Sequence, residues 1–167
     1  NRFELPVIKV EGANLPEAWE QSVLSVWENG VPVPTEYDKP GDPPSKEATM
    51  VMVVKDPFAE PRIHRAFPGG LEELEVYRQE VVKGVHDHWI DPEAGKWTYT
   101  YHKRLADYET EGKRIDQLAY IVDRLVASPC TRRAQGITWN VALDTPTDDP
   151  PCLQRIWCRI YEDGENG

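Results

Sequence analysis

The chain has 167 residues, of which 40% are apolar, and this is enough material for one buried core with little room for two. Its formal net charge of −10 argues against a general nucleic-acid binder, because such proteins draw their non-specific affinity from clustered lysines and arginines. No run of about 18 apolar residues is present, and residues 1–6 lack the basic and apolar regions of a signal peptide. We therefore expect a soluble, cytoplasmic protein without a membrane partner.

Residues 3–10 predict a short strand, and a helix should follow. Asn14 is a good N-cap for this helix, and Pro16 suits its first turn. Apolar residues, beginning with Trp19, then recur at helical spacing until Gly30, which should end the helix.

The next part of the chain alternates between loops and regular elements. Five prolines within residues 31–46 predict an irregular surface loop. The valine-rich residues 48–55 are typical of a short, mostly buried strand. Residues 60–70 break regular structure, and a helix is expected over residues 71–83, with Gly84 as its stop.

The clearest helical pattern covers residues 115–127. Alternating residues predict strands over 135–141 and 153–161, separated by a loop over 144–151 that is rich in proline and aspartate. Helices and strands without regular βαβ alternation indicate an α+β fold around a largely antiparallel or mixed sheet. Asp163-Gly164 is typical of a hairpin turn, and because no strand returns from it, we expect the fold to continue beyond this sequence.

The three cysteines, Cys130, Cys152 and Cys158, are odd in number and lack the Cys-x-x-Cys spacing of zinc and redox sites. Free thiols in a reducing compartment fit this pattern. The His-x-His pair of His86 and His88 has no third ligand at a sensible spacing, so we assign no metal.

The most specific pattern lies between the last helix and the last strand. Two adjacent arginines, Arg132 and Arg133, precede a strand that ends in Trp139-Asn140, and Cys152 directly follows two prolines. In this order and spacing the segment resembles the thymidylate synthases and their relatives, the pyrimidine nucleotide hydroxymethylases. Each element alone would be a weak signal, but together they are specific.

Two further stretches resemble the same family. Residues 115–133 are similar to the helix that leads into the arginine pair, and residues 97–105 are similar to the tyrosine-containing segment that lines the active site. The likeness covers residues 85–161, while the part before Glu60 matches no family pattern. The resemblance implies one thymidylate synthase-like domain over residues 1–167, incomplete at its C-terminus.

The resemblance implies that Cys152 is the nucleophile, whose thiolate adds to C6 of a pyrimidine nucleotide and activates C5 toward the co-substrate 5,10-methylenetetrahydrofolate. A buried, inert cysteine is the plain alternative. Arg132 and Arg133 would bind the nucleotide 5′-phosphate with their guanidinium groups, across the interface of a homodimer with shared active sites. Two solvated arginines after a helix end are the alternative for this pair.

The family also uses a tyrosine and a glutamate. Tyr101 is the better match for the residue that positions the cysteine and the ring, ahead of Tyr99, although either could pack as a plain aromatic. A carboxylate on an upstream helix relays protons to the pyrimidine carbonyl. Glu60, Glu73 and Glu80 are candidates, and we favour Glu73 as the catalytic one.

Trp89 stands where the family has an aromatic residue beside the folate, although a simply buried tryptophan is also common. Two positions depart from the family: Leu153 replaces a histidine, and His102 replaces a glycine. These departures keep a dCMP or CMP hydroxymethylase open beside conversion of dUMP to dTMP. A non-catalytic nucleotide-binding relative is the alternative from another class.

Overall fold

The computed structural model describes residues 3–161. The chain divides into two compact units, Asn1–Leu74 and Glu75–Gly167, and the division falls within helix α2 (Leu71–Lys83). Both units combine helices with short strands, so the predicted α+β class is confirmed. One domain over residues 1–167 stays a prediction. Within the described part of the chain, no helix has both the length and the apolar character needed to cross a membrane.

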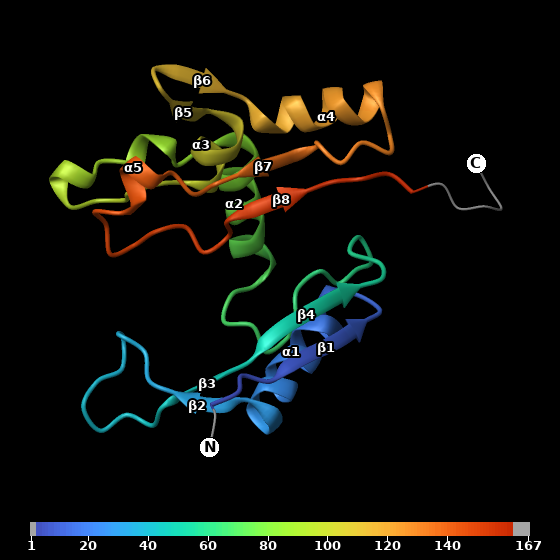
Figure 1. Ribbon diagram of the computed structural model, residues 1–167, viewed down its shortest axis with the longest axis vertical. Helices are drawn as coiled ribbons and strands as arrows, with labels where there is room; N and C mark the ends of the chain where they lie inside the picture. The colour runs from blue at the N-terminus through green and yellow to red at the C-terminus, as the bar shows by residue number, and fades with distance from the viewer. Residues whose placement is uncertain (1–2, 162–167) are drawn as a thin grey trace. The chain divides into compact units, whose positions relative to one another are not determined.

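The first unit is built on two parallel strands, β1 (Val7–Gly12) and β4 (Thr49–Val54), with helix α1 (Leu15–Asn29) beside them (Figure 1). The close contact between helix and strand depends on Gly12. A Cβ atom at this position would lie 2.3 Å from the backbone nitrogen of Ala18, so only glycine fits there.

Helix α1 begins and ends as predicted. The Asn14 side chain accepts a hydrogen bond from the Glu17 N–H at 3.0 Å, and the Glu17 carboxylate accepts one from the Ala13 N–H at 2.8 Å. This reciprocal capping satisfies two amides that the first turn leaves unpaired. Gly30 caps the C-terminal end.

Three predictions in this unit need correction. The first strand begins at Val7 rather than at residue 3. The ends of the expected loop pair as an antiparallel hairpin, β2 (Val31–Val33) with β3 (Ser45–Glu47). Strand β4 forms as predicted but is not buried, because Val51 and Met52 are each about half exposed.

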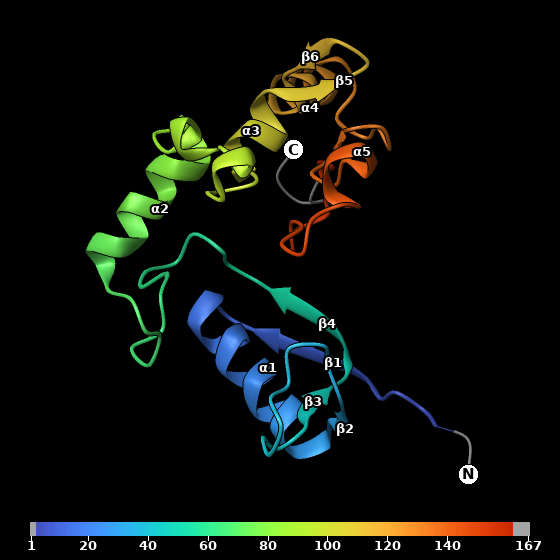
Figure 2. The ribbon, with the colours of Figure 1, turned by 90° about the vertical axis from the view of Figure 1, so that its left-hand side faces the viewer.

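In the second unit, the short helix α3 (Tyr101–Ala106) lies beside a hairpin of β5 (Tyr108–Thr110) and β6 (Lys113–Ile115) and contacts helix α4 (Gln117–Ala127) (Figure 2). The sequence analysis missed α3 and this hairpin. It also started the last long helix two residues early, since Asp116 is the N-cap of α4.

The expected antiparallel pair near the C-terminus is present but short. Strand β7 (Gln135–Ile137) pairs with β8 (Arg155–Trp157). The strand predicted over residues 135–141 stops early because Asn140 caps a further short helix, α5 (Val141–Asp144), and accepts a hydrogen bond from the Leu143 N–H. The expected turn at Asp163-Gly164 lies outside the described residues.

A buried ion pair joins α3 to α5. The Arg104 guanidinium donates to both carboxylate oxygens of Asp144 at 2.7 Å and to the Thr138 carbonyl at 2.8 Å. Burial alone would raise the pKa of Asp144, but the hydrogen bonds from Arg104 and from the Asn140 N–H outweigh it, and the pKa is lowered. The pair therefore stays charged in the interior.

Asp144→Ala should lower the free energy of unfolding by about 3–5 kcal/mol, because it leaves the Arg104 charge buried without a partner. Urea denaturation measures this loss. Glu75→Gln is the matched control, since it removes an ion pair with Arg78 on the exposed surface of α2 and should leave stability nearly unchanged. Equal effects of the two substitutions would contradict the structural importance of the buried pair.

Candidate active site

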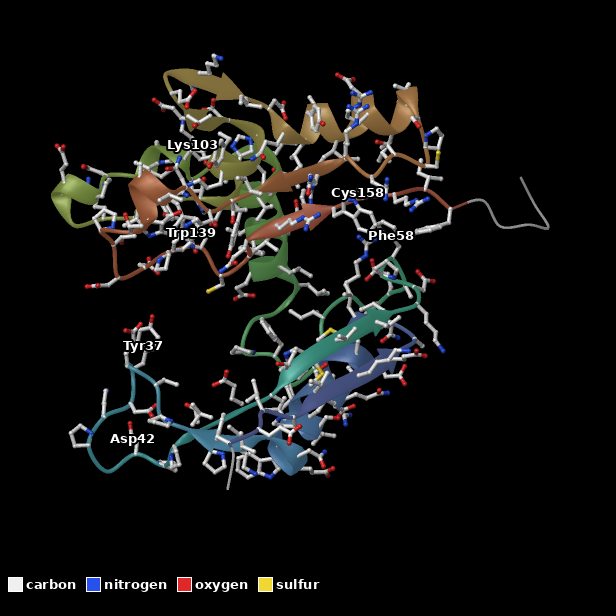
Figure 3. The ribbon with its side chains drawn as sticks, viewed as in Figure 1. Tyr37, Asp42, Phe58, Lys103, Trp139 and Cys158 are labelled. Atoms are coloured by element: carbon white, nitrogen blue, oxygen red, sulfur yellow. The ribbon has the colours of Figure 1, made fainter. Side chains whose placement is uncertain are left out.

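A cavity of about 270 Å³ lies in the second unit, between α2 and the segment that leads into α3. Figure 3 marks Lys103 on α3 and Trp139 beyond β7 in the same half of the chain. Aromatic and acidic side chains dominate the walls of the cavity. The lining residues are Tyr77, Glu80, Trp97, Thr98, Tyr99, Thr100, Tyr101 and Asp149.

The start of α3 positions Tyr101. Thr100 is the N-cap, and its hydroxyl accepts a hydrogen bond from the Lys103 N–H at 3.0 Å. The Tyr101 hydroxyl in turn accepts a hydrogen bond from the Leu153 N–H at 3.1 Å. The tyrosine thus contacts the residue that directly follows Cys152, across 52 positions of sequence.

Cys152 is exposed. Tyr99 is influenced by several groups around it. Burial raises the pKa of Tyr99 most, a hydrogen bond with Tyr101 raises it next, and the charges of Tyr101, Asp149 and Cys152 raise it further. The position of the thiol follows from its neighbour in the chain, because the Leu153 N–H donates to the Tyr101 hydroxyl. An exposed thiol differs from the inert, buried cysteine of the plain alternative.

Glu80 places a carboxylate on the helical wall of the cavity. The pKa of Tyr77 is raised by burial and then by the charges of Tyr101 and Glu80, so these three side chains share one neighbourhood. The Glu80 Oε2 lies 2.9 Å from Nδ1 of His86, and both side chains are largely buried.

Trp89 belongs to an aromatic cluster next to this carboxylate. The His86 ring stacks on Trp89 with centroids 3.7 Å apart and planes 9° from parallel. Trp97 packs edge-on against Trp89 at 5.0 Å. Trp89 remains 41% exposed, so it is not the simply buried tryptophan of the alternative reading.

Asp87 connects the loop after α2 to α3. Its carboxylate accepts a hydrogen bond from the Thr100 hydroxyl at 2.5 Å and pairs with Nδ1 of His102 at 2.7 Å. Gly84 has a positive φ of 66°, and a Cβ atom there would lie 2.3 Å from Nδ1 of His102. His102 therefore occupies the space that a side chain on Gly84 would need.

The arginine pair does not line this cavity. Arg132 and Arg133 lie just before β7, whose register with β8 brings Ile137 opposite Arg155 and Gln135 opposite Trp157. Cys152 precedes the Ile137 end of this ladder, so the arginines and the cysteine lie beyond opposite ends of it. Within residues 3–161, neither guanidinium forms an ion pair or a hydrogen bond.

The two other glutamates named from the sequence lie in the first unit. Glu73 is in the first turn of α2, where its carboxylate accepts a hydrogen bond from the Gly70 N–H at 2.9 Å. The hydrogen bonds of backbone amides, its own and that of Gly70, lower its pKa. Glu60 pairs with Arg62 on the surface. Neither lines the cavity, and the role predicted for Glu73 stays a prediction.

Sequence reasoning passed over three acidic and imidazole groups of this site. Asp149 was placed in a plain loop, and Asp87 and His86 were read as parts of a polar loop. For the helical wall of the cavity the sequence did offer a signal, because the spacing of Tyr77 and Glu80 puts both on one face of a helix. Among residues 3–161, no three His, Cys, Asp or Glu side chains gather as a set of metal ligands.

No protein-family model matches the chain. A protein of Methanosarcina acetivorans named "Putative thymidylate synthase" is 27% identical over 153 residues, which are 92% of this chain and 64% of that protein. One of the same name from Methanopyrus kandleri is 28% identical over 163 residues, 95% of this chain and 68% of the relative. A "Thymidylate synthase" of Brachyspira hyodysenteriae is 32% identical over 84 residues, which are 50% of this chain and 30% of the relative.

The chain spans between 60% and 64% of the length of four relatives from Methanosarcina and Methanococcoides. The similarity extends over most of this chain, including the part before Glu60 in which the sequence analysis found no family pattern. The predicted resemblance to the thymidylate synthase family is confirmed.

Gly84→Ala should destabilise the protein more than Gly95→Ala does. Both glycines have nearly the same positive φ, 66° and 68°, so each substitution costs about 1–2 kcal/mol of backbone strain. Only at Gly84 would the added methyl group meet His102, since nothing lies within 4 Å of a Cβ at Gly95. Thermal unfolding of the two variants measures the difference, and equal melting temperatures would show that His102 does not pack on Gly84.

Proposed function

We propose that this chain, a relative of the thymidylate synthases, contains the nucleophile and the proton-relay carboxylate of an enzyme that modifies C5 of a pyrimidine nucleoside 5′-monophosphate. 5,10-Methylenetetrahydrofolate would supply the one-carbon unit. The observation that carries the proposal is the exposed Cys152 next to Tyr99, Tyr101 and a small cavity with a carboxylate on its wall. A thiol nucleophile and a carboxylate that can move protons would serve the addition of a thiolate to a pyrimidine ring.

Cys152 would begin the reaction. Its thiolate sulfur would form a bond to C6. The electron pair of the C5–C6 double bond would become the C4–C5 double bond, while the carbonyl pair at C4 moves to the oxygen to give an enolate. C5 would then attack the methylene carbon while one of the two bonds from that carbon to a folate nitrogen breaks, and C5 would lose its proton to a base. The remaining carbon–nitrogen bond would break to release tetrahydrofolate and leave an exocyclic methylene at C5. The sulfur–C6 bond would break as a hydride or water adds to that methylene. Transfer of a hydride from the reduced folate completes dTMP, whereas capture of the intermediate by water gives a 5-hydroxymethyl nucleotide.

Glu80 is the carboxylate that we propose for the proton relay. It lines the cavity together with Tyr101, whereas Glu73 lies in the other unit. A general acid or base must come within hydrogen-bonding reach of its proton, directly or through one water molecule. Trp89 would contact the folate, since its partly exposed indole offers a flat apolar surface for the pterin ring.

Arg132 and Arg133 would bind the 5′-phosphate in the active site of a second copy. The described cavity is lined by the carboxylates of Glu80 and Asp149 and by no lysine or arginine, so its own walls provide no cation for a phosphate. The arginines lie beyond the far end of the β7–β8 ladder, and their guanidinium groups form no ion pair with any of residues 3–161. A homodimer that exchanges these arginines accounts for both observations.

Cys152→Ala should abolish a covalent adduct with 5-fluoro-dUMP and 5,10-methylenetetrahydrofolate, because the fluorine at C5 blocks completion of the reaction. Intact mass spectrometry of the full-length protein detects the adduct. Cys130→Ala is the matched control, since Cys130 is also exposed and its sulfur contacts the Ser128 hydroxyl at 3.8 Å. An adduct that survives Cys152→Ala, or no adduct in the unmodified protein, would contradict the proposed enzyme and favour the non-catalytic nucleotide-binding relative.

Glu80→Gln should slow tritium release from C5-labelled nucleotide by about 10²-fold or more, the usual contribution of a general acid or base. Glu73→Gln is the matched control on the same helix and should have little effect. Testing labelled dUMP and dCMP separately also separates methylation of dUMP from hydroxymethylation of a cytosine nucleotide. The reverse result, a slow Glu73→Gln and a normal Glu80→Gln, would assign the relay to Glu73.

A further inference from the structure

We propose that His86 is a positioning residue that holds the Glu80 carboxylate in its working orientation at the cavity wall. The inference rests on the proposed function and adds to it a residue that the thiol chemistry does not itself require. Three observations support it: a hydrogen bond to one oxygen of the carboxylate, a second oxygen that forms no hydrogen bond within residues 3–161, and a tightly packed imidazole ring.

The contact between the two side chains is short and shielded. His86 Nδ1 lies 2.9 Å from Glu80 Oε2, and the side chains are 17% and 14% exposed. With its hydrogen on Nδ1, the imidazole donates to the carboxylate. A hydrogen bond to a charged group in a largely buried place is stronger than one on the surface.

The other oxygen of Glu80 remains available. Oε1 forms no hydrogen bond within residues 3–161, and every fully buried polar side-chain atom in that range does have a partner. Oε1 is therefore accessible to solvent, on a side chain that lines the cavity. One oxygen of the carboxylate is held and the other is left to meet a water molecule or the substrate.

The imidazole itself has little freedom to move. It stacks on Trp89 with ring centroids 3.7 Å apart, and Trp97 meets it edge-on at 5.9 Å. The backbone on either side of it is also fixed, because the Asp87 N–H donates to the Gly84 carbonyl and the Trp89 N–H donates to the carbonyl of His86. A rigid donor restricts the rotamers of Glu80, so less conformational entropy is lost when the carboxylate acts.

The competing explanation is that the pair only fastens α2 to the loop that follows it. In that case the loss of His86 would disturb adduct formation and proton relay alike. If His86 acts through Glu80, its loss should slow tritium release while Cys152 still forms the 5-fluoro-dUMP adduct. The two explanations therefore differ in which step they affect.

The test uses two substitutions of His86 in the full-length protein. His86→Phe keeps a flat ring against Trp89 but removes Nδ1, and it should lower the rate of tritium release about tenfold or more, as expected for losing a hydrogen bond to a charged group. His86→Asn keeps a donor near the position of Nδ1 and should restore much of that rate. His88→Gln is the matched control, since His88 is exposed and its ring forms a T-shaped contact with Trp89 at a centroid distance of 5.8 Å.

A double-mutant cycle completes the test. In a Glu80→Gln background, His86→Phe should cause almost no further loss, because the residue acts through the carboxylate. Equal losses in both backgrounds, no rescue by His86→Asn, or loss of the adduct in His86→Phe would overturn the inference while leaving the proposed function in place. Absence of both adduct and tritium release in the unmodified protein would overturn the proposed function and this inference together.

Discussion

The buried ion pair between Arg104 and Asp144 is the interaction on which the arrangement of the cavity depends. Helix α3 has only six residues, too few to be stable without tertiary support. The pair ties it to α5, and the guanidinium of Arg104 also lies over the ring of Tyr99 at 5.6 Å. Because Tyr101 begins the same short helix, the position of the tyrosine pair follows from this one buried contact.

The loop that carries Cys152 is held from its C-terminal side. Two prolines precede Cys152 and offer no N–H groups for hydrogen bonds, so the segment before the thiol cannot be fixed by backbone donors at those positions. After it, the Gln154 carbonyl accepts a hydrogen bond from the Thr138 N–H at 2.9 Å, and the Thr138 hydroxyl donates to the Leu153 carbonyl. The loop is therefore attached to the end of β7, while the thiol itself stays exposed.

The sequence predicted those parts of the fold that local signals determine. Helices α1 and α2 were predicted at their ends because Asn14, Gly30 and Gly84 mark them through backbone chemistry. Helix α3 was missed because tyrosine and threonine favour strands, and the capping hydroxyl of Thr100 outweighed that preference. The motif identified Cys152 as a candidate, but the choice among glutamates depends on packing, which no local pattern records.

Leu153, the position at which the sequence departs from the histidine of the family pattern, contacts its surroundings through its backbone. Its N–H donates to the Tyr101 hydroxyl and its carbonyl accepts from the Thr138 hydroxyl, so Leu153 holds the loop that carries Cys152 through its backbone. Any residue except proline can make these contacts, and a leucine here leaves the geometry of the loop intact. An imidazole is present near the cavity nonetheless, because His86 contacts Glu80, which lines it. The leucine side chain at this position therefore does not change how the loop that carries Cys152 is held.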